Sequence, residues 1–154
     1  MIRQEIKAAL QDSLRAKDSC AVSTLRLITA AIKDRDICER SKGNNNGIAD
    51  DQVMTLLHTM IRQRRDSIGL YEQGGRLDLA ENEAQEIEVI KRFLPLQMQE
   101  EEIAEAVAGV ISEQGASSLK DMGKVMASLR EKYAGRMDFA AASCLAKGTL
   151  SEAT

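Results

Sequence analysis

The chain contains a single proline among its 154 residues, Pro95, and this residue limits how helices can be arranged along it. Proline has no backbone N–H and its ring clashes with the preceding turn, so a helix that leads to Pro95 is predicted to end near Leu94. Phe93 and Leu94 are apolar and are expected to pack rather than to lie in water. We interpret the stretch as a packed hinge between two helical domains, residues 1–95 and 96–154. The alternative is a turn within one bundle.

Apolar residues recur every three or four positions along most of the chain, which is the spacing of one face of an α-helix. Hydrophobic residues make up 44% of the sequence but aromatic residues only 3%, so the core must consist mainly of aliphatic side chains and methionine. Long runs of β-branched residues are absent, which disfavours strands. We therefore predict an all-α protein, with an N-terminal bundle of about four helices and a small C-terminal domain of three helices.

Capping residues and glycines predict where these helices begin and end. Asp and Ser side chains accept hydrogen bonds from the free N–H groups of a first turn, and glycine commonly follows a last turn. The segment 41–47 is rich in Gly and Asn but lacks a phosphate-loop pattern, so it is expected to be a flexible connector. The expected starts are Asp18 or Ser19, Asp50 or Asp51, capping boxes of Asp78 with Glu81 and of Ser118 with Asp121, and Asp138; the expected stops are Lys17, Gly74–Gly75, Gly115 and Gly135.

Charge is unevenly distributed in the second half of the chain. The net charge of −3 argues against a general basic coat for nucleic acid, and two Phe and two Tyr are too few for aromatic platforms that grip single strands. Residues 96–116 contain five Glu and no Lys or Arg, whereas residues 117–148 contain six basic and three acidic residues. The basic half is either a solvated helix surface or an anion-binding one.

The sequence predicts no self-contained active site. It has no nucleophile elbow, Cys-x-x-Cys, His-Glu-x-x-His or dinucleotide motif, and His58 is the only histidine. The cysteines, Cys20, Cys38 and Cys144, lack metal-ligand spacing and are interpreted as buried or idle thiols in a reducing cytosol. No apolar run approaches membrane-spanning length. We expect a cytoplasmic monomer with no cofactor, no metal and no membrane contact.

The predicted sixth helix, about residues 119–133, combines an apolar face with a basic side. At about 100° per residue, Lys120 and Lys124 lie opposite the apolar arc, and Gly123 lies at one edge of it. Glycine inside a helix costs roughly 1 kcal/mol relative to alanine, so it requires a reason. Close approach of another helix is the favoured reason, and close approach of a ligand backbone is the alternative. The arc predicted to be buried consists of Leu119, Met122, Val125, Met126, Leu129 and Tyr133.

Motifs in both halves resemble the GatB/YqeY family, over about residues 1–150. The stretches 24–28, 63–68, 75–80 and 86–95 are similar to the stand-alone YqeY-like proteins. Two stretches of the C-terminal half resemble the tail-domain motif of the family. They are Leu119-Lys120-Asp121-Met122-Gly123-Lys124-Val125-Met126 and, after it, Gly135-Arg136-Met137-Asp138. The chain departs from the family after Asp138, where Phe139-Ala140-Ala141 replaces the common Gly and basic residue and removes a charge that a phosphate would use.

The resemblance implies an all-α protein whose C-terminal unit is similar to the tail of the B subunit of glutamine-dependent tRNA amidotransferase. In that enzyme the tail contacts tRNA, while the chemistry lies in a separate catalytic cradle and a separate amidase subunit. The family label is carbon–nitrogen ligase with glutamine as amide donor. This chain lacks the corresponding machinery, so we expect no catalysis by the chain alone.

The leading hypothesis is a non-catalytic accessory protein that binds tRNA or associates with the tRNA amidotransferase in translation. Candidate partners are tRNA and components of the amidotransferase or of an aminoacyl-tRNA synthetase. The alternatives are an adaptor that docks its basic surface on an acidic protein, and a subunit of a glutamine-dependent amidotransferase that needs other chains. The candidate RNA-contacting residues are Lys120, Gly123, Lys124, Arg130, Lys132 and Arg136, with a weaker second patch of Arg62, Arg65 and Arg76.

Overall fold

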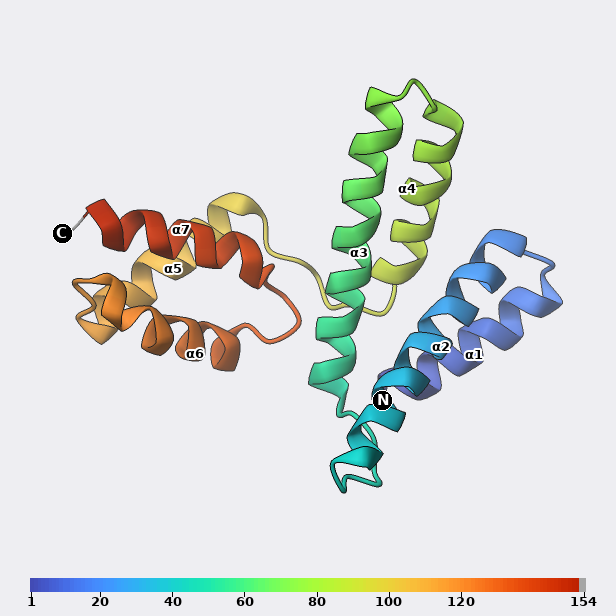
Figure 1. Cartoon of the computed structure of the whole chain (residues 1–154), viewed down its shortest axis with the longest axis horizontal. Coiled ribbons are helices and arrows are strands. Elements are labelled where there is room, and N and C mark those ends of the chain that lie inside the picture. Colours follow the sequence, from blue (N-terminus) through green and yellow to red (C-terminus); the bar gives the residue numbers. More distant parts are fainter. Residues whose placement is uncertain (153–154) are drawn as a thin grey trace. The chain divides into compact units, whose positions relative to one another are not determined.

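The computed structural model describes residues 1–152 and contains helices and connections but no strand over that range (Figure 1). The all-α prediction is therefore confirmed. The chain divides into two compact units, Met1–Leu94 and Pro95–Thr154. Residues 153 and 154, the end of the expected second domain, lie outside the described residues. The helices are α1 (Ile2–Arg15), α2 (Ser19–Ser41), α3 (Asp50–Gln73), α4 (Leu77–Lys91), α5 (Glu100–Gln114), the 3-10 helix η1 (Leu119–Asp121), α6 (Met122–Lys132) and α7 (Phe139–Glu152).

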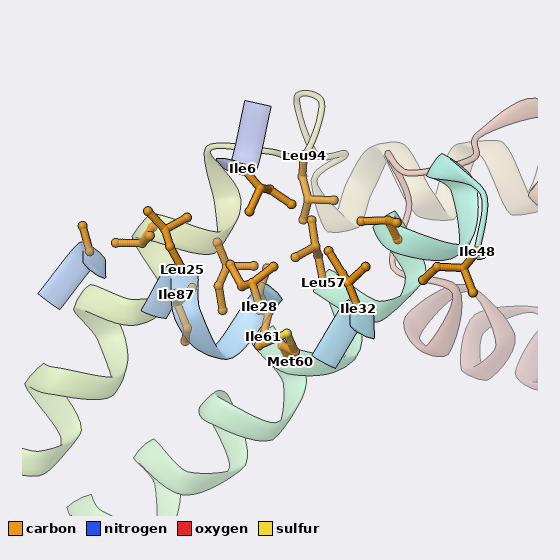
Figure 2. Packing of buried hydrophobic residues seen from close by; sticks show 14 residues of the cluster. Ile6, Leu25, Ile28, Ile32, Ile48, Leu57, Met60, Ile61, Ile87 and Leu94 are labelled. Atoms are coloured by element: carbon orange, nitrogen blue, oxygen red, sulfur yellow. The ribbon is translucent and has the colours of Figure 1, made fainter. Parts of the chain in front are cut away.

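The N-terminal unit consists of two antiparallel helical hairpins (Figure 1). α1 packs against α2 and α3 against α4, and α2 also contacts both α3 and α4. Figure 2 shows the interior, to which α2 contributes Leu25, α3 contributes Leu57 and α4 contributes Ile87. Leu94 is buried in the same core and Phe93 packs partly against it, so the prediction that these two residues are packed is confirmed.

Local sequence signals place most helix boundaries where they were expected. The Asp18 carboxylate accepts a hydrogen bond from the Ala21 N–H (3.1 Å) and caps α2. α3 ends directly before the Gly74–Gly75 pair. Gly115 follows α5 with a φ of +61°, a left-handed conformation that glycine adopts without strain. The caps and glycines therefore gave reliable helix ends.

The start of α4 differs from the prediction. α4 begins at Leu77, so Asp78 lies inside its first turn, and the predicted capping box of Asp78 with Glu81 is wrong. The Asp78 carboxylate instead accepts two hydrogen bonds from the guanidinium of Arg76, at 3.3 Å each. Negative charge in a first turn is favoured by the helix dipole, which explains why an acidic residue marks this helix without capping it.

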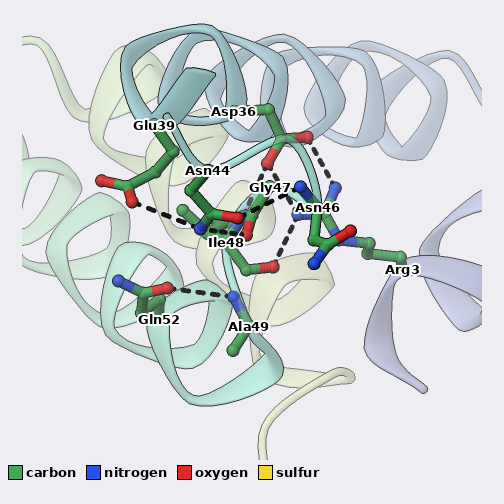
Figure 3. A network of polar contacts seen from close by, with 9 residues as sticks. All are labelled: Arg3, Asp36, Glu39, Asn44, Asn46, Gly47, Ile48, Ala49 and Gln52. Atoms are coloured by element: carbon green, nitrogen blue, oxygen red, sulfur yellow. Dashed lines mark hydrogen bonds and ion pairs between the residues drawn. The ribbon is translucent and has the colours of Figure 1, made fainter. Parts of the chain in front are cut away.

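A polar network holds the connector between α2 and α3 (Figure 3). The guanidinium of Arg3 donates two hydrogen bonds to the Asp36 carboxylate (2.7 and 2.8 Å) and one to the carbonyl of Ile48 (2.7 Å). Asp36 also accepts from the Ile48 N–H (2.9 Å), and the Asn44 amide donates to the carbonyl of Gly47 (3.1 Å). The segment is a connector, as predicted, but these hydrogen bonds fix its position, which composition did not indicate.

The C-terminal unit is a small three-helix arrangement in which α5, α6 and α7 each pack against the other two. Its core contains Val107 of α5, Leu129 of α6 and Ala142 of α7. The segment after the proline is tied to the α6–α7 loop, because the Gln97 amide donates to the carbonyl of Gly135 (2.8 Å) and the Met98 N–H donates to the carbonyl of Arg136 (2.9 Å). The core residues of this unit are distinct from those of the first.

Candidate nucleic-acid interface

The basic surface of the C-terminal unit begins at the turn before α6. The Asp121 carboxylate accepts hydrogen bonds from the N–H groups of Ser117 (3.1 Å) and Ser118 (3.4 Å), so this acidic residue organises the start of the helix, as the predicted capping box required. The first turn is the 3-10 helix η1 rather than part of α6. Because a 3-10 turn has about three residues, a projection at 100° per residue does not apply to it.

The apolar face of α6 is buried as predicted over its central part. Val125, Met126 and Leu129 are buried, and Met122 and Tyr133 pack partly against the same core. Leu119 is the exception: its side chain is 45% exposed, so its assignment to the core is wrong. The reason is that Leu119 belongs to η1, outside the α-helix from which the buried arc was projected.

Gly123 lies on the exposed side of α6, and no helix approaches it within the described chain. A Cβ atom built at Gly123 would meet no other heavy atom of the described residues within 4 Å. The preferred explanation for this glycine, close packing of a neighbouring helix, is therefore wrong. Its alternative explanation, close approach of a ligand backbone, stays a hypothesis.

Four predicted cations of this unit are exposed and have no side-chain hydrogen bond or ion pair with any of residues 1–152. They come from η1, from α6 and from the α6–α7 loop, so they precede and follow Gly123 along the chain. Lys124 and Arg130 are about 120° apart around α6 at about 100° per residue. The four are Lys120, Lys124, Arg130 and Arg136, which we call the basic surface.

Lys132 does not belong with the free cations, because it is already paired. Its ammonium donates to the carboxylate of Glu113 on α5, and this hydrogen bond raises the pKa of Lys132. Both side chains are about half exposed, and ion pairs at the surface contribute little to stability, so this pair is weak. Nothing in the sequence links the two residues, which are 19 positions apart.

Two of the three acidic side chains in residues 117–148 accept hydrogen bonds from backbone N–H groups. The Asp121 carboxylate holds the turn before α6, and the Asp138 carboxylate accepts from the Ala140 N–H (3.0 Å), which confirms the predicted cap of α7. Glu131 is the remaining acidic side chain of residues 117–148, and it is exposed on α6. Within residues 1–152, none of these three carboxylates forms an ion pair with a cation of the basic surface.

The second predicted patch is not one cluster. Arg62 and Arg65 are exposed and three residues apart on α3, which places them on one side of that helix. Arg76 lies beyond the end of α3, after the Gly74–Gly75 turn, and its guanidinium is paired with Asp78. Arg64, between the first two, faces the hairpin and pairs with Glu86 of α4 (2.9 Å).

Over residues 1–152 no group of three His, Cys, Asp or Glu side chains has the geometry to hold a metal ion. The three cysteines are free thiols; Cys38 and Cys144 are exposed, so of the two interpretations burial does not apply to them, and the other, an idle thiol, stays a prediction. None of the helices within residues 1–152 is both long enough and apolar enough to cross a membrane.

Comparison with known proteins agrees with the architecture described above. Three fungal proteins named "Altered inheritance of mitochondria protein 41, mitochondrial" are similar to this chain. The protein from Lachancea thermotolerans is 34% identical over 89 residues, covering 58% of this chain and 46% of that protein. The proteins from Kluyveromyces lactis and Clavispora lusitaniae are each 31% identical, covering 66% and 70% of this chain and 55% and 61% of those proteins. The chain thus spans about half the length of these relatives.

The family model described as Yqey-like protein matches residues 3–150, which is nearly the whole chain. This match confirms the resemblance to stand-alone YqeY-like proteins that the sequence motifs indicated. The similarity of the C-terminal unit to the amidotransferase tail is not part of this finding and stays a hypothesis. On the strength of the match over residues 3–150, the chain belongs to the Yqey-like protein family.

Proposed function

We propose that this protein is a non-catalytic accessory factor that binds tRNA through the basic surface of its C-terminal unit. The observation that carries the proposal is the presence of four exposed cations, Lys120, Lys124, Arg130 and Arg136, without side-chain partners among residues 1–152. Exposed Lys and Arg side chains bind phosphates and release counterions, which is the main source of sequence-independent affinity for nucleic acid. The exposed and uncrowded helix surface at Gly123 supports the proposal, because a phosphate backbone has room to approach it.

The proposal does not depend on one cellular compartment. The names of the fungal relatives place those proteins in mitochondria, and the location proposed here is the cytoplasm. Both compartments contain tRNA. Lys132 contributes to binding only if RNA displaces Glu113 from it, and the exposed ion pair is weak enough for that exchange.

The test is the salt dependence of tRNA binding. We expect the double change Lys120→Ala with Lys124→Ala to reduce the slope of log K against log salt by roughly 1.5, since each phosphate contact contributes about 0.7–0.9. Affinity should fall by a similar factor for different tRNAs, because phosphate contacts position the protein and do not specify sequence. The measurement is fluorescence anisotropy with labelled tRNA at several salt concentrations.

A matched control separates a local contact from a change in total charge. The double change Lys7→Ala with Lys33→Ala removes the same charge from exposed positions of α1 and α2. It should leave the slope unchanged if the C-terminal unit carries the site. Thermal unfolding of both variants checks the fold. An unchanged slope in a folded Lys120/Lys124 variant would exclude these lysines from an RNA site.

A protein-docking adaptor is the second candidate, favoured by exposed apolar side chains on the same unit. Leu119 of η1 is 45% exposed and Leu145 of α7 is 39% exposed, and η1 packs against α7. An adaptor would lose partner binding on Leu119→Ser with Leu145→Ser, whereas tRNA affinity would not change. The third candidate, a subunit of a glutamine-dependent amidotransferase, would be supported by amide transfer that requires this chain together with other subunits.

A further inference from the structure

The N-terminal unit contains an open groove that the proposed RNA-binding function does not use. The groove has a volume of about 230 Å³ and lies between the C-terminal half of α2 and the N-terminal half of α3. This volume corresponds to roughly eight water molecules and is below the roughly 300–1,000 Å³ of drug-sized sites. A ligand that fills it must therefore be small.

Two helix faces form the walls. One wall consists of Arg35, Cys38 and Glu39 of α2 with Lys42 directly after it, and the other consists of Gln52, Thr55, Leu56 and Thr59 of α3; both sets follow helical spacing. The connector joins the two helices, which run in opposite directions, so the Lys42 end of one wall lies near the Gln52 end of the other (Figure 1). Arg35 consequently lies at the same end of the groove as Thr59.

The floor of the groove is fixed by the polar network of the connector. Ile48 lines the groove and is itself only 6% exposed. Its carbonyl accepts a hydrogen bond from Arg3 and its N–H donates to Asp36, so both backbone polar groups of Ile48 are held (Figure 3). The floor of the groove is therefore fixed before any ligand arrives, which reduces the entropy cost of binding.

The strong acceptors of the groove are already occupied, whereas several donors are not. The two Glu39 oxygens accept from the Lys42 ammonium (3.0 Å) and the Asn44 amide (3.4 Å), which lowers the pKa of Glu39. The Gln52 oxygen accepts from the Ala49 N–H (3.0 Å), and this orientation leaves the Gln52 NH₂ group as a donor (Figure 3).

Arg35 is the cation of this groove that stays unpaired. It is exposed and has no side-chain hydrogen bond or ion pair with another residue of the described range 1–152, whereas Lys42 is paired with Glu39. Two cations against one carboxylate give the lining a net charge of +1. The hydroxyl protons of Thr55 and Thr59 go to the carbonyls of Asp51 and Thr55 (3.1 Å each), so the hydroxyl oxygens can accept from a ligand.

We propose that the groove binds a small hydroxylated organic anion. Its carboxylate or phosphate group is held by Arg35, and its hydroxyl groups donate to the threonine oxygens of α3. The Gln52 amide supplies a further donor at the opposite end, and Ile48 and Leu56 contact the carbon skeleton. This binding site is independent of the tRNA proposal, because it uses different residues in the other unit.

Cys38 offers a direct measure of occupancy, since its exposed thiol lines the groove. Citrate and glycerol 3-phosphate are suitable probes, because they carry the two possible anionic groups and both have hydroxyls. A bound probe should slow alkylation of Cys38 by iodoacetamide about fivefold or more at a several-fold excess over its Kd. Alkylation of Cys144, which is exposed on α7 of the other unit, should not change. Peptide mass spectrometry of the full chain measures both rates.

Arg35→Gln should abolish the protection of Cys38, whereas Arg26→Gln, an exposed arginine of α2 outside the groove, should keep it. Protection by citrate alone assigns a carboxylate ligand, and protection by glycerol 3-phosphate alone assigns a phosphate ligand. Equal protection by sodium chloride of the same ionic strength, equal protection of Cys144, or no protection by either probe at millimolar concentration would overturn the proposal. If Arg35→Gln fails to fold, the alkylation rates of Cys38 and Cys144 in the unmodified chain still test whether the groove binds the probe.

Discussion

At the scale of single residues, Asp36 shows how a partly buried contact depends on charge. Its carboxylate accepts from both terminal nitrogens of Arg3 and from the Ile48 N–H. The hydrogen bond from Arg3 is the largest cause of a pKa lowered to about 2. Because the ionised form is favoured in the folded state, Asp36 stabilises the fold above its unfolded pKa near 4 and loses that contribution as the pH falls toward 2.

We therefore expect Asp36→Asn to lower the free energy of unfolding by about 1–2 kcal/mol near neutral pH, a value reduced for solvent screening at the partly exposed Arg3. The amide oxygen still accepts from the Ile48 N–H, but the amide NH₂ replaces the second acceptor of Arg3, so the change removes the charge and one hydrogen bond from Arg3. The difference from the unmodified chain should shrink below about pH 4. Urea unfolding at several pH values measures it, with Asp34→Asn, an exposed carboxylate of α2, as the control. A difference that is constant with pH would point to packing instead.

At the scale of the element, α6 carries a glycine that its fold does not require. Gly123 lies in a helical turn, is exposed and has open space where a Cβ would lie. We expect Gly123→Ala to raise the free energy of unfolding by about 0.5–1 kcal/mol, because alanine loses less backbone entropy on forming a helix. Chemical denaturation measures this change.

Gly109 of α5 is a matched position, exposed and with the same open space, so Gly109→Ala should give a similar gain. We expect the two variants to have similar stability and to differ in their affinity for tRNA. A backbone that contacts RNA at Gly123 should make Gly123→Ala weaken binding, while Gly109→Ala leaves it unchanged. Destabilisation by Gly123→Ala would contradict the open environment of this helix surface.

At the scale of the whole molecule, the two units have separate cores with no residue in common. We predict that a fragment of residues 95–154 is helical and unfolds cooperatively by itself. A chain of about 60 residues buries only about 60% of its surface, so its stability should be marginal. Circular dichroism with thermal unfolding tests this. A disordered fragment would show that the C-terminal unit needs the first unit to fold.

The periodicity of apolar residues predicted burial most reliably at the centres of helices and least reliably near their ends. In α1 an apolar residue recurs every four positions and forms a stripe along one side of the helix: Ile6 is buried, Ile2 and Leu10 are half-buried, and Leu14 is 48% exposed. Each residue of the stripe has the same local pattern. Burial also requires a neighbouring element, and the end of a helix has fewer neighbouring elements than its centre. Leu119 fails for a related reason, since it precedes α6 and is not part of it.

The sequence by itself determined the all-α class, most helix ends and the hydrogen-bonding roles of Asp18, Asp121 and Asp138, because periodicity and capping act within a few residues of the chain. Only the tertiary structure decided which cations are free. Lys132 is neutralised by Glu113 and Arg64 by Glu86, pairs formed by helices packed side by side and separated by 19 and 22 positions. The groove between α2 and α3 also depends on the tertiary structure, since the Arg3–Asp36 pair that supports its floor joins residues 33 positions apart. Contacts of this kind depend on which helix faces meet, and no local pattern specifies that.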